Sequence, residues 1–103
     1  MRIYWTNVEF TFQNTHPDYG KYKGGEVFAF VESKDSENAL KRFKEELYKL
    51  HYSPFDFEFI KPYELTLEWE EKSETGKFKD IYNLAKNNEN VIFDDFYIYE
   101  KID

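Results

Sequence analysis

Hydrophobic and polar residues alternate with a period of two over the first part of the chain, which predicts strands. Over residues 2–13 one face carries Tyr4, Thr6, Val8, Phe10 and Phe12. The opposite face is apolar only at its start, so Trp5 is expected to be partly exposed. Residues 26–33 are apolar on both faces, which is typical of a central strand. The short loop between the two segments predicts an antiparallel hairpin.

The pattern then changes to a helical one. Leu40, Phe43, Leu47 and Leu50 follow the three-and-four spacing of one helical face. Asp35 or Ser36 is suited to cap the first turn, because a short polar side chain can accept a hydrogen bond from a free backbone N–H. A helix over residues 36–50 is therefore expected.

Alternation returns after the helix. Phenylalanine occupies every second position over 55–59, and a second alternating run covers 63–70. Pro62 separates the runs and cannot donate a hydrogen bond to a neighbouring strand. We expect one long strand that is bent or bulged at Pro62, with two separate strands as the alternative.

The last part of the chain predicts one more helix and one more strand. Ser73 or Thr75 can start the helix, expected near 76–87, and its apolar face is formed by Phe78, Ile81, Tyr82 and Ala85. Residues 91–101 form the last expected strand. Phe93, Asp95 and Tyr97 fall on one of its faces, and Asp94 falls on the other.

The predicted order is β-β-α-β-α-β, in a single α+β domain over residues 1–103. The last strand–helix–strand unit favours a right-handed crossover to a parallel neighbour. The simplest layered solution is a four-stranded mixed sheet with both helices packed on one face. The opposite face would then be wholly or partly open.

Composition narrows the class of protein. The chain has 103 residues and is rich in aromatic side chains, with 11 Phe, 9 Tyr and 2 Trp, so a core can form despite the small size. The absence of cysteine excludes disulfides, thiolate nucleophiles and cysteine-bound metals. No secretion signal or membrane-spanning stretch is expected, and a cytoplasmic location is the default.

Candidate catalytic and metal-binding residues are few. His16 falls in a loop and His51 at a helix end, and no nucleophile is tied to either. The acidic doublets Glu70-Glu71 and Asp94-Asp95 would point to opposite faces of extended strands. We therefore expect no enzyme activity, no cofactor and no metal. Acidic residues on the strands also argue against direct nucleic-acid binding.

The negative charge is concentrated in the second half of the chain. Residues 1–54 hold 8 acidic and 8 basic side chains, whereas residues 55–103 hold 13 acidic and 6 basic ones. Carboxylates beside aromatic rings are typical of a surface that docks a basic protein. The expected contacts of that partner are Glu64, Glu68, Glu70, Asp94, Asp95 and Tyr97.

The segment EVFAFV at 26–31, followed by the predicted helix and the closing segment FDDFYIYE at 93–100, gives a small, acidic, cysteine-free and aromatic-rich α+β chain. In this it resembles the immunity proteins of bacterial toxin systems, including contact-dependent growth inhibition. The resemblance implies a one-to-one complex with a toxin domain, often a nuclease, and no catalysis. A nucleic-acid-mimicking inhibitor of the anti-restriction or anti-CRISPR type, and a small enzyme or ligand-binding domain, are the alternatives. The oligomeric state stays open.

Overall fold

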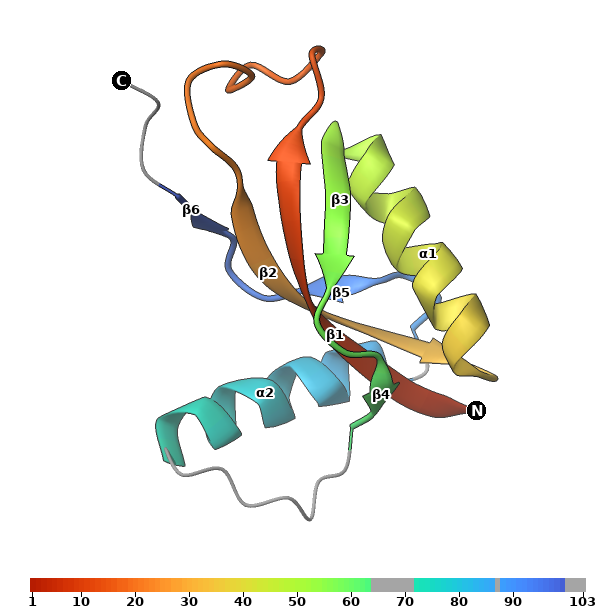
Figure 1. The fold of residues 1–103 in the computed structure, drawn as a ribbon. Coiled ribbons are helices and arrows are strands. Elements are labelled where there is room, and N and C mark those ends of the chain that lie inside the picture. The colour runs from red at the N-terminus through yellow and green to blue at the C-terminus, as the bar shows by residue number, and fades with distance from the viewer. Residues whose placement is uncertain (64–71, 87, 100–103) are drawn as a thin grey trace.

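A computed structural model describes residues 1–63, 72–86 and 88–99 of the chain. The elements belong to the α+β class, as predicted from the sequence (Figure 1). In chain order they are β1 (Arg2–Phe12), β2 (Gly25–Ser33), α1 (Ser36–Lys49), β3 (Tyr52–Phe57), β4 (Lys61–Pro62), α2 (Lys72–Ala85), β5 (Ile92–Phe93) and β6 (Tyr97–Ile98).

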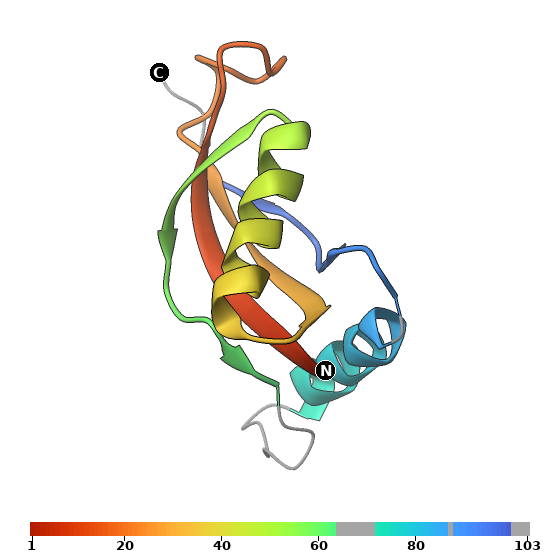
Figure 2. The ribbon, with the colours of Figure 1, turned by 90° about the vertical axis from the view of Figure 1, so that its right-hand side faces the viewer.

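The sheet has six strands and is antiparallel at every pairing among the described residues. β1 and β2 form the predicted hairpin at its centre; β3 and β4 pair with β1, while β5 and β6 pair with β2. Figure 2 shows β3 and β4 following one another along the same edge. The prediction of a four-stranded mixed sheet was wrong. The chain through α2 joins opposite edges of the sheet, so no parallel pair forms between neighbours.

Helix α1 begins where the sequence predicted. The Asp35 carboxylate accepts a hydrogen bond from the backbone N–H of Asn38 at 2.8 Å, as an N-cap residue does. The helix ends at Lys49, and His51 follows with a φ of 66°. Ala39, Phe43 and Leu47 form its buried face. Leu50 lies past the helix end and is exposed, so it does not extend this face as predicted.

The two helices cover opposite faces of the sheet, which corrects the prediction that both pack on one face (Figure 1). Residues of α1 pack with Tyr4, Val8 and Phe10, from one side of β1. The buried face of α2 packs instead with Ile3 and Trp5, from the other side. Side chains alternate between the faces of a strand, so these two sets cannot share one face.

Trp5 is therefore a core residue rather than a partly exposed one, with only 2% of its surface accessible. Its ring stacks on Phe28 and Phe30 and meets Phe78 of α2 edge to face, with centroids 5.7, 5.7 and 5.5 Å away. Aromatic pairs at these distances add to the stabilisation from burial alone. This cluster attaches α2 to the sheet.

The strand after α1 is interrupted before Pro62, not at it. β3 ends at Phe57 and pairing with β1 resumes at β4, which includes Pro62 itself. Between them the Thr6 hydroxyl donates a hydrogen bond to the Phe59 carbonyl. β3 and β4 thus pair with the same strand on either side of a break at 58–60. The predicted run beyond Tyr63 lies outside the described residues, so the choice between one bent strand and two separate strands stays a prediction.

The predicted last strand is also broken. Ala29 pairs with Phe93 in β5, and Glu26 pairs with Tyr97 in β6, with irregular backbone at 94–96 between them. Phe93 lies on the α1 side with Ala29, whereas Tyr97 lies on the opposite side with Glu26. The irregular segment therefore shifts the alternation by one residue.

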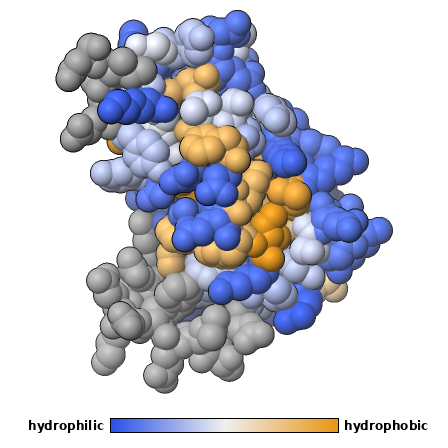
Figure 3. All heavy atoms as spheres, in the orientation of Figure 1, coloured by the Kyte–Doolittle hydropathy of each residue, from blue (hydrophilic) through white to orange (hydrophobic). Residues whose placement is uncertain are grey.

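Hydrophobic residues reach the surface in the middle of the space-filling view and are bordered by hydrophilic ones (Figure 3). Neither helix in the described part of the chain has the length and apolar character that crossing a bilayer requires.

Candidate partner-binding site

A row of carboxylates crosses the sheet on the face that α2 covers only in part. Glu9 of β1 lies opposite Glu26 of β2 on one side and opposite Asp56 of β3 on the other. Tyr97 of β6 extends the row beyond Glu26. Directly paired residues of antiparallel strands project from the same face, so the three carboxylates lie side by side. We call Asp56, Glu9, Glu26 and Tyr97 the acidic row.

Tyr99 lies beside the acidic row. Its hydroxyl donates a hydrogen bond to Oε1 of Glu9 at 3.2 Å, and its ring contacts that of Tyr97 at 5.9 Å. Burial and the neighbouring carboxylates of Glu26 and Glu9 raise the pKa of the Tyr99 phenol to about 12, because each disfavours the phenolate. Burial is the larger cause of the shift, and the carboxylates add to it.

This pKa shift predicts a specific loss of stability in alkali. An unfolded tyrosine ionises near pH 10 and the folded Tyr99 only near 12, so the stabilisation that Tyr99 gives is complete below pH 10 and is lost between these values. The difference in the free energy of unfolding between wild type and Tyr99→Phe should shrink over that interval. Denaturant unfolding at several pH values measures it. A phenolate signal of Tyr99, obtained as the wild-type minus Tyr99→Phe absorbance difference, that titrates at pH 10 would contradict the assignment.

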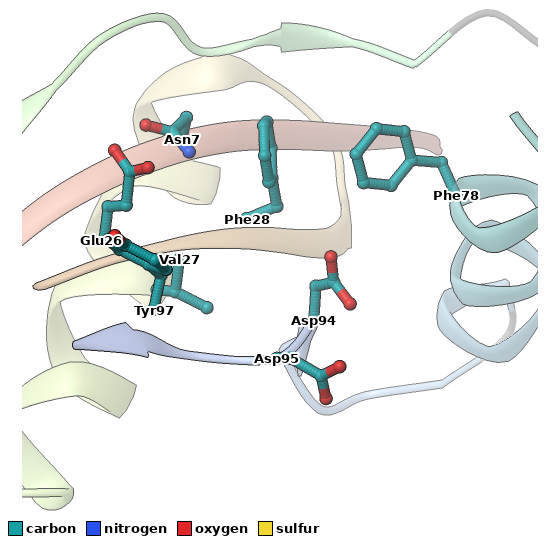
Figure 4. Close-up of a pocket in the computed structure, with 8 residues that line it drawn as sticks. All are labelled: Asn7, Glu26, Val27, Phe28, Phe78, Asp94, Asp95 and Tyr97. Carbon is teal, nitrogen blue, oxygen red and sulfur yellow. The ribbon is translucent and has the colours of Figure 1, made fainter. Parts of the chain in front are cut away.

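A pocket of about 210 Å³ opens beside the acidic row, between the sheet, α2 and the segment 94–96. Figure 4 shows its lining, with Asn7 and Glu26 toward one end of the view and Phe78, Asp94 and Asp95 toward the other. The lining residues are Asn7, Glu26, Val27, Phe28, Phe78, Asp94, Asp95 and Tyr97.

The break between β5 and β6 places both aspartates at this pocket. The backbone N–H of Asp94 donates to the Phe28 carbonyl at 2.9 Å, which fixes the first residue after β5. Asp95 follows in irregular backbone, so the opposite orientation expected of two neighbours in a strand does not apply. Both residues line the same pocket.

Asn7 is the buried polar group of the site. The residue is only 5% exposed, and its side-chain amide has no hydrogen-bond partner among the described residues. In Figure 4 the amide is turned toward the space between Glu26 and Phe28.

Three of the six contacts predicted from the sequence meet here. Asp94, Asp95 and Tyr97 line the pocket, and Tyr97 is 64% exposed. The other three, Glu64, Glu68 and Glu70, lie outside the described residues, so their part stays a prediction. Sequence reasoning missed Asn7, Glu9 and Glu26. For Asn7 and Glu9 the alternation along β1 was a usable signal, because it places both residues on one face of the strand.

The histidines have local structural contacts. Nδ1 of His51 lies 2.7 Å from the Thr15 hydroxyl, and Nδ1 of His16 accepts the backbone N–H of Asp18. The His16 ring also stacks on Tyr52. In the described ranges, no three His, Asp or Glu side chains are grouped so that they could hold a metal ion.

Comparisons of the chain with protein-family models, with curated proteins and with solved structures found no match. The chemistry of the site itself favours one kind of ligand. Carboxylates attract cations, aromatic faces stack on them, and an amide oxygen accepts their N–H groups.

Proposed function

We propose that this chain is a binding protein that neutralises a basic protein partner by occluding the partner's functional site, as an immunity protein does with its toxin. The observation that carries the proposal is the acidic row. Its three carboxylates lie on neighbouring strands, where like charges repel one another. A cationic surface on a partner would turn this repulsion into attraction.

The described residues do little to neutralise the row. Glu9, Glu26 and Asp56 form no ion pair with any residue of the chain that the structure describes. The ion pair that does occur there joins Lys49 and Glu46 on α1, which covers the opposite face of the sheet. A row of unneutralised carboxylates steers a basic protein toward this face and raises the association rate.

Exposed aromatic side chains supply the second component of a docking surface. Tyr97 is 64% exposed at one end of the acidic row, and Phe55 is 62% exposed on the edge strand β3. Aromatic residues that become buried at an interface carry a large share of the binding energy. Glu64, Glu68 and Glu70 are proposed to extend the same acidic surface.

Charge reversal tests the proposal once the partner has been captured and purified. The double variant Glu26→Lys with Asp56→Lys should weaken binding by about 30-fold or more, because it places cations opposite the partner's own cations. The matched control is Glu37→Lys with Glu45→Lys on α1, which makes the same change in net charge away from the row. Calorimetry at two salt concentrations gives both the affinity and its salt dependence.

Two outcomes would reject the proposal. If the α1 variant abolishes binding and the row variant does not, the partner docks on the other face. If both variants bind like wild type with the same salt dependence, the acidity has no part in recognition. The same measurement on Glu68→Lys with Glu70→Lys tests the contacts predicted from the sequence.

A further inference from the structure

We propose that His16 is an acid-sensitive switch that holds the loop between β1 and β2 against the turn between α1 and β3, and releases the loop when its ring takes up a proton. The loop spans residues 13–24, and the turn consists of residues 50 and 51. The loop lies at the end of the sheet away from α2 (Figure 1). The inference does not rest on the proposed function.

Two kinds of contact hold the loop in place. The first kind does not titrate: the backbone N–H of Gln13 donates to the His51 carbonyl at 2.9 Å, and the Gln13 side-chain amide donates to the Tyr52 carbonyl at 2.8 Å. The second kind is the half-buried His16 ring, which packs on the rings of Tyr52 and Phe12 with centroids 5.1 and 4.6 Å away. The first contacts fix the start of the loop, so the residues that follow rely on side-chain contacts such as that of His16.

The His16 ring must be neutral to make its hydrogen bond. Nδ1 accepts the backbone N–H of Asp18 at 2.9 Å. A backbone N–H can only donate, so Nδ1 carries no proton and the ring proton lies on Nε2. In an imidazolium both nitrogens are donors, and Nδ1 would then point its own N–H at that of Asp18. Protonation of His16 and this hydrogen bond are therefore mutually exclusive.

His51, the other histidine of the chain, makes a contact that does not depend on its charge. Its Nδ1 lies 2.7 Å from the Thr15 hydroxyl, which can donate to a neutral nitrogen or accept from a protonated one. Rotation of the hydroxyl hydrogen is enough to keep the contact when His51 is protonated. The two histidines thus differ in whether their partner can reverse the direction of the hydrogen bond, and His51 is an internal control for His16.

The charges around the His16 ring favour the released position in acid. The titratable groups near it are the Asp18 carboxylate within the loop, the Tyr52 phenol from β3 and His51 in the adjacent turn, while on β1 the ring meets the apolar Phe12. Burial and then the Asp18 carboxylate raise the pKa of the Tyr52 phenol, so the phenol stays neutral throughout the range in which histidine titrates. The Asp18 carboxylate attracts an imidazolium and can accept its N–H once the ring has turned away from the backbone N–H.

Release of the ring would expose aromatic surface at this end of the sheet. Phe12 is only 6% exposed and belongs to the core cluster that contains Leu47 of α1, and Tyr52 packs against the same cluster. The His16 ring lies against both Phe12 and Tyr52, so its departure opens this end of the cluster to water.

NMR of the ring nitrogens follows the two histidines separately. The full chain is titrated from about pH 8 to pH 5, the range in which histidine changes charge while ordinary carboxyl groups stay largely ionised. At pH 8 we expect His16 to carry its proton on Nε2. On acidification the His16 ring signals and the backbone amides of Thr15, Asp18 and Tyr19 should follow one titration curve. The protection factor of the Asp18 amide against hydrogen exchange should fall about tenfold or more.

Three variants locate the effect. In His16→Asn the side-chain oxygen can still accept the N–H two residues on, as asparagine does in turns, but it does not titrate, so the loop amides should not change between pH 8 and pH 5. His16→Phe keeps a ring without an acceptor and should show low protection at Asp18 at both pH values. His51→Asn is the matched control, because asparagine tolerates the φ of 66° found there, and it should retain the wild-type response at Asp18.

Three results would overturn the inference. They are a neutral His16 with its proton on Nδ1, an acid response of the Asp18 amide that persists in His16→Asn, and a loss of protection at Asp18 while the other loop amides keep the shifts they have at pH 8. The last result would mean that the hydrogen bond breaks without release of the loop. None of these results bears on partner binding at the acidic row, which charge reversal tests separately.

Discussion

Replacing Trp5 by alanine is expected to lower the free energy of unfolding by about 3–5 kcal/mol, the range for removing a large buried aromatic side chain. Trp5 is 2% exposed and contacts rings from β2, from α2 and from the chain around β4. Its removal would leave a cavity where α2 meets the sheet. Urea unfolding followed by circular dichroism measures the change without relying on tryptophan fluorescence.

Phe55→Ala is the control for this measurement, because it removes an aromatic ring that is 62% exposed. Its cost should be about 1 kcal/mol or less, the range of strand preferences at surface positions. A small domain has a total stability of roughly 5–15 kcal/mol, so Trp5→Ala should be close to unfolding while Phe55→Ala should not. Equal effects of the two changes would contradict the packing of α2 on Trp5.

Gly24→Ala should produce the second large loss, of about 2–5 kcal/mol. Gly24 has a φ of 136°, which L residues rarely adopt, and a methyl group there would overlap the backbone carbonyl oxygen of Phe10. Backbone strain and the displacement of β1 from β2 would then add. Thermal unfolding by calorimetry gives the loss, and amide exchange at the end of the hairpin shows where it occurs.

Gly20→Ala separates these two causes. Gly20 also has a positive φ, of 80°, but a methyl group there would meet no atom within 4 Å. Its substitution therefore carries the conformational cost alone, about 1–3 kcal/mol. If the two alanine variants are equally stable, the close approach of Gly24 to Phe10 is not a constraint on the fold.

The helices and the central hairpin could be predicted from the sequence, because the spacing of their apolar residues is regular. It did not show which face of the sheet α2 covers, since the face of β1 that carries Trp5 becomes polar at Asn7 and Glu9. The clue lay in β2, where Phe28 and Phe30 oppose an equally apolar second face. A strand that is apolar on both sides needs cover on both sides, which is incompatible with two helices on one face.

Only part of the candidate site was predicted, because the sequence does not show which residues share a face of the sheet. Asp94, Asp95 and Tyr97 were identified from local charge, but charge was compared between halves of the chain rather than between faces of the sheet. Glu9 and Glu26 belong to the electrically neutral half and join the acidic row only through strand pairing. The shift of alternation at 94–96 depends on tertiary pairing, and no residue in that segment signals it.

The interruption between β5 and β6 also affects how copies of the chain meet. A continuous strand at the edge of a sheet offers unpaired backbone groups to a neighbouring molecule, which is a route to aggregation. Here β5 and β6 pair with β2 through two residues each, with adjacent aspartates between them, and β3 on the other side carries Pro54 and Asp56. The same short segment that builds the pocket thus deprives a second copy of a template for strand addition.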